Sequence, residues 1–397
     1  MRSLFSAVVL AFIPLVITRS LTGTVAIDSK LTYLLTPTYT GNLSQNFVDT
    51  ENLPASTQEL FTFARAAPFI VYDPEFSDII GQNATAILIA EQDTPFAAEA
   101  GVWVPDRNEV WFTSSTVNNS NYLMVLDLAT SSVTFPQTSI PILNPNGGYY
   151  FNGTVYITGT GTLTQAPCIY AINPSTKEAS IVLNTYFGLR FNGPNDVTWI
   201  TRGNKSYMFF TDDPISETYV AGIPLRLPDA VWRFCSEDGT LIPVISRADI
   251  LIPNGIRVNI EQTKLYVTDS TATDLAPTLQ GGAVGTGSPA IFIFDIDDEA
   301  FPVNKRMFGI SRTGIPDGIH IDDAGRVWTG EYEGVVVRNV NGKVIGLFNS
   351  EVFDDDPSEQ VRNFALAGDT LVLLEQTRIW TVKLAQQVVA PNASQSQ

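Results

Sequence analysis

Six polar residues recur along the chain, each nine to fourteen residues before the third residue of a strand-like segment: Glu99, Asn146, Asn195, Asn254, Asp317 and Asn363. Several lie in corners such as "GPND", "IPNG" and "IPDG". Any one of these corners is explained equally well as a turn, because Asn, Asp and Gly tolerate positive φ. Two carboxylates and four amides form a hard-oxygen set that suits Ca²⁺ better than zinc or copper. If the six converge, a metal site is expected, because buried carboxylates without a cation are costly.

The segments that follow these residues indicate the architecture. An apolar, aromatic and small-residue pattern recurs as "EVWFTS", "TVYITG", "YMFFTD", "KLYVTD", "RVWTGE" and, degraded, "TLVLLE", with markers Trp111, Tyr156, Phe209, Tyr266, Trp328 and Val372. The separations of 45, 53, 57, 62 and 44 residues predict an all-β fold, a six-bladed β-propeller with a central metal site. A β-sandwich would explain short strands but not this spacing. The innermost strand of each propeller blade begins beside the channel, so the polar residues should meet on one axis.

Residues 1–20 are interpreted as a signal peptide. Arg2 precedes an apolar run of 14 residues, Leu4 to Ile17, and small residues near Ser20 offer a cleavage site. The run is shorter than the roughly 20 residues that a membrane helix needs. The sequence therefore predicts a secreted protein whose mature form does not span a membrane.

The remaining chain divides into three expected parts. Residues 21–65 form an N-terminal extension, residues 66–386 the propeller, and residues 387–397 a flexible C-terminal tail. The segments "FIVYDPEF" and "TAILIAEQD" are strand-like and are expected to close the ring against the last strands, near "RIWTVKLA".

Composition restricts the partners and the chemistry. With 41 acidic and 23 basic residues, the net charge of −18 repels phosphate backbones, so nucleic-acid binding is not expected. His320 is the only histidine, which excludes zinc sites built on several His, and no "GxSxG" accompanies it for a serine triad. It is interpreted either as a structural residue of a blade wall or as a residue of the substrate pocket.

Two cysteines and six glycosylation sequons are the candidate sites of covalent modification. Cys168 and Cys235 are the only cysteines, and their offset positions on equivalent strands argue against a disulfide without excluding one. Six sequons agree with export, at Asn42, Asn83, Asn118, Asn152, Asn204 and Asn392.

Three acidic residues end returning strands: Asp212, Asp269 and Glu331. Hydrogen bonding between blades is favoured for them over metal ligation.

The quoted corners, together with "PFIVYDPEFSDIIG" and "NPNGGYYFNGTVYITG", resemble the SMP-30/gluconolactonase family of calcium-dependent propellers over roughly residues 65–385. The resemblance is strongest to secreted fungal lactonohydrolases, which open aldonate and pantoyl lactones. It implies Ca²⁺ ligands at Glu99, Asn195, Asn254 and Asp317, with Asn146 and Asn363 as neighbours that touch substrate or water. Ala98 stands where those relatives often carry His, so one substrate or proton-relay contact is in doubt.

These observations lead to an expected reaction. Ca²⁺ would polarise the carbonyl of a small lactone, and Asp317 would orient or deprotonate water. His320 and Tyr219 are further candidates for substrate binding, and the sparsely charged loops hint at a neutral substrate. Mg²⁺ or Mn²⁺ remains an alternative occupant, and a homodimer is left open. The alternatives are a phosphotriesterase-like hydrolase or a non-hydrolytic metabolite-binding or biosynthetic propeller.

Overall fold

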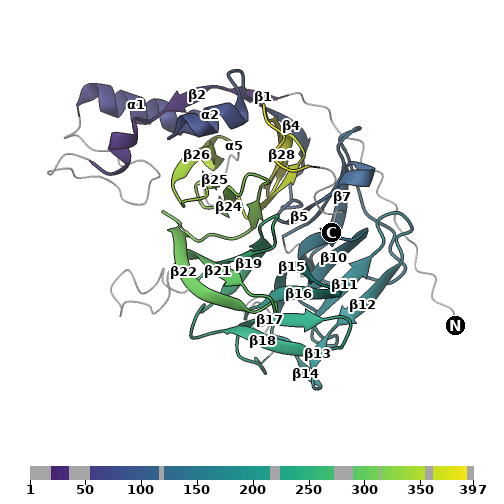
Figure 1. Ribbon diagram of the computed structural model, residues 1–397. Helices are drawn as coiled ribbons and strands as arrows, with labels where there is room; N and C mark the ends of the chain where they lie inside the picture. Colours follow the sequence, from purple (N-terminus) through teal and green to yellow (C-terminus); the bar gives the residue numbers. More distant parts are fainter. Residues whose placement is uncertain are drawn as a thin grey trace.

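Six sheets, antiparallel except for one parallel pair at the edge of the fifth, follow one another around a common centre in the computed structural model (Figure 1). The structure describes residues 19–34, 54–115, 120–214, 224–271, 289–312, 314–353 and 361–390. The first two blades are β5 (Glu99–Val104), β6 (Glu109–Thr113), β7 (Leu123–Asp127), β8 (Ser132–Thr134) and β9 (Pro145–Phe151), β10 (Thr154–Gly159), β11 (Cys168–Ile172), β12 (Ala179–Leu183). The next two are β15 (Pro194–Arg202), β16 (Lys205–Asp212), β17 (Ala230–Cys235), β18 (Leu241–Ser246) and β19 (Pro253–Val258), β20 (Lys264–Asp269), β21 (Ala290–Ile296), β22 (Pro302–Ile310).

The last two blades are completed by strands from the N-terminal part of the chain. The fifth is β23 (Ile319–Ile321), β24 (Val327–Glu331), β25 (Gly334–Arg338) and β26 (Val344–Asn349), extended by β3 (Phe69–Val71) and β2 (Thr24–Ala26). The sixth is β27 (Asn363–Ala367), β28 (Thr370–Glu375) and β29 (Arg378–Lys383), extended by β4 (Thr85–Glu91) and β1 (Ser20–Thr22). The ring is thus an all-β, six-bladed propeller, as the marker spacing predicts.

Ring closure follows the sequence prediction in one segment and departs from it in another. The segment "TAILIAEQD" supplies β4, which pairs antiparallel with β29. The segment "FIVYDPEF" instead supplies β3, which pairs with β26 of the fifth blade. Its second half turns into α2 (Pro74–Ile80), because Asp73 caps the backbone N–H of Glu75 at 3.0 Å and Pro74 occupies the first helical position.

Short elements complete the described chain. They are η1 (Ser29–Thr32), α1 (Ala55–Arg65), η2 (Pro105–Arg107), the β13–β14 ribbon (Thr185–Tyr186 and Leu189–Arg190) and α5 (Ser350–Phe353). The helices α1 and α2 lie outside the ring beside the fifth blade (Figure 1). Within the described residues, no helix combines the length and apolar character needed to cross a bilayer.

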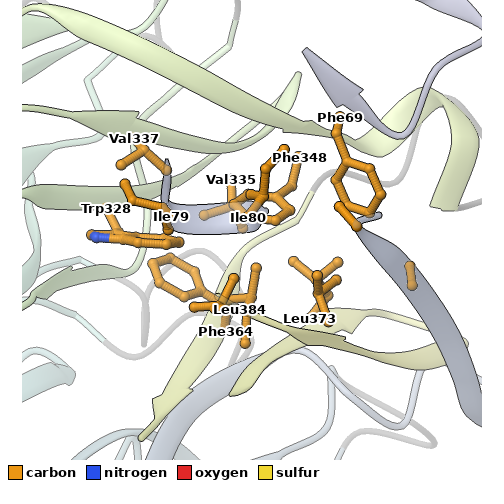
Figure 2. Packing of buried hydrophobic residues seen from close by; sticks show 14 of the residues in the cluster. Phe69, Ile79, Ile80, Trp328, Val335, Val337, Phe348, Phe364, Leu373 and Leu384 are labelled. Atoms are coloured by element: carbon orange, nitrogen blue, oxygen red, sulfur yellow. The ribbon is translucent and has the colours of Figure 1, made fainter. Parts of the chain in front are cut away.

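The hydrophobic core lies between adjacent blades. All six marker residues occupy second strands, and each packs in the interface with the following blade: Trp111, Tyr156, Phe209, Tyr266, Trp328 and Val372. Figure 2 shows one interface, where Trp328 and Phe348 of the fifth blade face Phe364 and Leu373 of the sixth. Aromatic markers therefore recur because five of the six interfaces place a large side chain on this face of the second strand, whereas the sixth blade has Val372 there.

Candidate functional site

The six polar residues predicted to converge all lie at the start of innermost strands. Glu99 and Asn363 begin β5 and β27, and the three other Asn are the second residues of β9, β15 and β19. Asp317 lies two residues before β23. All six are buried, with exposed fractions of 9% or less. These six residues, called the polar ring from here on, therefore lie at one end of the central channel, as the propeller prediction requires.

Three of the corners do not place the ring residue at positive φ, whereas the corner after Glu99 has positive φ at Ala100 (73°) and Gly101 (65°). Asn195, Asn254 and Asp317 all lack left-handed backbone conformation. Gly255 and Gly318 are required instead by close packing. A Cβ on Gly255 would lie 2.3 Å from the carbonyl oxygen of Asp317, and one on Gly318 would lie 2.4 Å from the Cγ of Asn363. Each glycine therefore lets the ring residue of the next blade approach the axis.

Carboxylates at the ends of returning strands hold two of these corners. Asp212 accepts hydrogen bonds from the backbone N–H of Asn192 at 3.1 Å and of Gly193 at 2.7 Å. Asp269 binds the two N–H groups before Pro253 in the same way, at 3.3 and 3.2 Å. Hydrogen bonding is thus their role, although it acts within a blade rather than between blades. It fixes the segments that carry Asn195 and Asn254.

Four threonines fix ring residues from the preceding blade, a role that sequence reasoning missed. The hydroxyls of Thr113, Thr158, Thr211 and Thr268 donate to the carbonyl oxygens of Asn146, Asn195, Asn254 and Asp317 at 3.0, 2.6, 2.6 and 2.9 Å respectively. Each threonine stands two residues after a marker. That spacing places both side chains on the face toward the next blade. The recurring Thr of the marker pattern was therefore the available signal.

Glu99 is held differently, through side chains of the two preceding blades. The Nδ2 of Asn363 donates to the Oε2 of Glu99 at 3.4 Å, and its Oδ1 lies 3.3 Å from the Nε2 of His320. His320 also packs against Phe364, with ring centroids 4.8 Å apart. Burial, followed by the charge of Arg257, holds the pKa of His320 well below its ordinary value. His320 therefore acts on the ring as a neutral support for Asn363.

The two ring carboxylates are electrostatically strained without a counter-charge. Burial raises the pKa of Asp317 to about 6, against the opposing effects of the Arg362 charge and a hydrogen bond from Asn254. Burial and the charge of Asp317 together raise the pKa of Glu99 well above its ordinary value. In addition, the Oδ1 of Asp317 is buried and has no hydrogen-bond partner. A cation placed between the two carboxylates would relieve all three conditions.

The amides of the ring are suited to complete such a site. The Nδ2 of Asn195 donates to Asp213 at 2.8 Å, which leaves the amide oxygen as the free ligand atom. The Nδ2 of Asn146 donates to the carbonyl oxygen of Asn195 at 3.2 Å. Across the described ranges, no group of three or more His, Cys, Asp or Glu side chains is placed to hold a metal. Any site here therefore depends on amide oxygens as well as on Glu99 and Asp317.

Beneath the ring, a buried ion pair divides the channel. Asp196 accepts a 2.6 Å hydrogen bond from Arg257, which also donates to the carbonyl oxygen of Gly148 at 2.9 Å. Below this pair lies a cavity of about 310 Å³ with contributions from all six blades, including the aromatic side chains of Trp103 and Trp199. His320 and Arg257 both line the cavity. None of the six ring residues lines this cavity.

Other predicted residues lie away from the ring or outside the described residues. Tyr219 is outside the described residues, as are the sequons at Asn42, Asn118 and Asn392. Asn83, Asn152 and Asn204 are exposed. Ala98, where a histidine is expected by resemblance, is fully buried. Cys168 and Cys235 are buried and are not joined by a disulfide.

Comparisons with known proteins match this chain across the propeller. The sequence model of the SMP-30/Gluconolactonase/LRE-like region matches residues 97–352. The chain is 25% identical to Lactonohydrolase oryH of Aspergillus oryzae, covering 74% of this chain and 77% of that protein. It is 27% identical to the Gluconolactonase of Zymomonas mobilis, covering 56% of this chain and 58% of that protein. A solved gluconolactonase structure from Xanthomonas campestris shares the fold, with a TM-score of 0.63 and 18% identity over 80% of this chain and 94% of that one.

Proposed function

The chain belongs to the SMP-30/gluconolactonase/LRE-like family, and we propose that it hydrolyses a small lactone with the help of a divalent cation, Ca²⁺, bound in the polar ring. Relatives named lactonohydrolase and gluconolactonase support the reaction class. The observation that carries the cation is the buried pair Glu99 and Asp317, one of whose oxygens lacks any partner. Such an arrangement is costly unless a positive charge or a proton accompanies it.

Four residues would hold the cation: Glu99, Asn195, Asn254 and Asp317. They supply carboxylate and amide oxygens, which are the donors that Ca²⁺ prefers. When bound, the cation would polarise the lactone carbonyl. Mg²⁺ prefers a rigid octahedral set completed by several waters, so a ring of protein oxygens favours Ca²⁺ over Mg²⁺.

The chain's own groups supply the proton transfers. Asp317 is the residue we assign to orient water or to accept a proton from it. The water oxygen bonds to the carbonyl carbon of the lactone, and the C–O bond within the lactone ring breaks. The departing alkoxide oxygen takes up the proton, which gives a hydroxy acid. Arg362 acts electrostatically on both Glu99 and Asp317, so its positive charge also favours the negative charge that develops during this step.

The neighbours of the ligands divide between support and substrate contact. The amide of Asn363 is engaged on both sides, by Glu99 and by His320, so we assign it and His320 to holding Glu99. Asn146 keeps its amide oxygen available beside Asn195 and is the candidate for substrate contact. We further propose that the substrate is uncharged and that Tyr219 contributes to its binding.

The remaining expectations stay proposals about the whole protein. Residues 1–20 are proposed to direct secretion, with glycan on some of the sequons and no membrane or nucleic-acid partner in the mature form. Mass spectrometry of protein secreted by a eukaryotic host would give the mature N-terminus and the occupied sequons. The molar mass measured by light scattering would show whether the protein is a homodimer.

The reaction is tested by following acid release in a pH-stat. Purified protein is assayed with aldonolactones and pantolactone in the presence of Ca²⁺, after chelation, and after separate restoration of Ca²⁺, Mg²⁺ or Mn²⁺. Activity that disappears with chelator and returns with Ca²⁺ supports the proposal. Tight Ca²⁺ binding without turnover of any lactone contradicts the reaction while retaining the site. Phosphotriester substrates and a metabolite-binding screen would then distinguish the two alternatives.

A further inference from the structure

In the first four blades, the innermost strand carries one extra residue close to its ring residue. In the third blade, pairing passes from Pro194–Asp212 to Val197–Phe210. Three residues on β15 thus span two on β16, and Asn195 lies inside this bulge. The fourth blade repeats the arrangement around Asn254. A bulge leaves backbone groups without ladder partners.

A buried carbonyl without a partner is costly, so the bulges create a need for donors. In the second, third and fourth blades a threonine of the preceding blade meets this need. Thr268 supplies the same kind of donor at Asp317, which lies just before β23. Thr211 donates to the carbonyl oxygen of Asn254, and Thr268 to that of Asp317, at 2.6 and 2.9 Å. Both threonines are fully buried. Each hydroxyl therefore ties the backbone of a ring residue to the neighbouring blade.

The fifth blade departs from this arrangement and provides an internal contrast. Its threonine, Thr329, stands one residue after the marker Trp328 rather than two. Because side chains alternate along a strand, its hydroxyl faces the other way. It donates to Glu331 at 2.6 Å and accepts from Arg338 at 2.7 Å, without reaching the ring.

We propose that Thr158, Thr211 and Thr268 are positioning residues that determine cation affinity, because they hold the backbones of Asn195, Asn254 and Asp317. This inference rests on the proposed function, in which those three residues are ligands. The fourth ligand, Glu99, pairs with Thr113 of its own blade, and its side chain accepts from the Nδ2 of Asn363 at the longer distance of 3.4 Å. Three of the four proposed ligands are therefore tied through their backbone carbonyls to a threonine of the preceding blade.

The test measures Ca²⁺ affinity by isothermal titration calorimetry on the full mature protein. Thr211→Val keeps the side-chain volume but removes the donor, and we expect the Kd to rise about tenfold. Thr211→Ser keeps the hydroxyl and should stay within about threefold of the wild type. Thr329→Val removes an equally buried hydroxyl that does not touch the ring, so it should lower the melting temperature and leave the Kd unchanged.

The outcomes separate the positioning role from the proposed function. A Thr211→Val variant with the wild-type Kd overturns the positioning role alone. So does an equal rise in Kd for Thr329→Val, because the effect would then be general destabilisation. If Thr211→Val does not fold, Thr268→Val against Thr268→Ser gives the same comparison at Asp317. Wild-type protein that binds no divalent cation overturns the metal site itself, and with it the positioning role.

Discussion

Asp196 in the third blade and Arg257 in the fourth form an ion pair of 2.6 Å directly beneath the polar ring, and both side chains are almost completely buried. Asp196 follows the candidate ligand Asn195 in sequence, yet it accepts from the backbone N–H of Ile256 as well as from Arg257. The neighbouring residues Asn195 and Asp196 therefore have different structural roles. Asn195 faces the ring, whereas Asp196 joins two blades and closes the channel below it.

Removing one partner of this pair should be strongly destabilising. We expect Asp196→Asn or Arg257→Met to lower the free energy of unfolding by roughly 3–5 kcal/mol, because each leaves an uncompensated buried charge or donor. Urea denaturation measures the change. The exposed pair Lys205–Asp238 serves as a control, and Asp238→Asn should leave stability nearly unchanged. Equal losses at the two sites would contradict the importance of burial.

Asp317→Asn should abolish most of the activity while the fold persists. Loss of the proton acceptor is expected to reduce kcat by about 10²- to 10⁴-fold, even at saturating Ca²⁺. The matched control is Asp323→Asn, because Asp323 lies at the far end of the channel and accepts from the backbone N–H of Ala390. Full activity of Asp317→Asn with Ca²⁺ bound would exclude it as the general base.

Chelation should lower thermal stability as well as activity. A cation that neutralises Glu99 and Asp317 binds only the folded ring, so Ca²⁺ at about 100 times its Kd should add about 2.7 kcal/mol to the free energy of unfolding. Differential scanning calorimetry with Ca²⁺ and with chelator measures this shift. In Glu99→Gln the shift should largely disappear, whereas a shift of unchanged size would place the cation elsewhere.

The buried carboxyl of Asp212 should make stability depend on pH. Burial raises its pKa from 3.8 to about 7, although two backbone N–H groups oppose the shift. The folded state therefore binds a proton that the unfolded state has already lost between these values. The stabilising contribution is complete below pH 3.8 and is lost as the pH rises through about 7.

Urea denaturation of metal-free protein between pH 4.5 and 8 would measure this effect. In Asp212→Asn the decline of stability with rising pH should be reduced, independently of any constant loss from the altered hydrogen bonds. An unchanged slope in the variant would show that other groups cause the decline.

Both cysteines should be inaccessible thiols in the native protein. Burial raises the pKa of Cys168 to about 11, and the pKa of Cys235 is also raised, chiefly by burial. Ellman's reagent should therefore react with neither thiol before denaturation and with both afterwards. A protein that releases no thiol on denaturation without reductant would instead contain a disulfide.

Much of the ring could be predicted because it depends on local rules. The marker aromatics and the polar residue before each recur at blade spacing, and alternation along a strand fixes which side chains share a face. The same rule would have assigned Thr158 and Thr211 to the interface with the next blade. The corner glycines were harder to interpret, since "PNG" and "PDG" also occur in turns, and only the approach of the next blade distinguishes the two cases.

The sequence alone determined the six-bladed architecture, the series of oxygen-bearing residues before each marker and the exclusion of metal sites built on several histidines, because repeat spacing and composition are local properties of the chain. The tertiary structure alone decided how the ring is held. Asn363 meets Glu99 across 264 residues, and Arg257 meets Asp196 across 61. Closure of the propeller brings the blades that carry these partners together, and the local sequence pattern around either partner does not specify the other. The same closure buries Glu99 and Asp317 together, and this burial raises their pKa values and favours a cation between them.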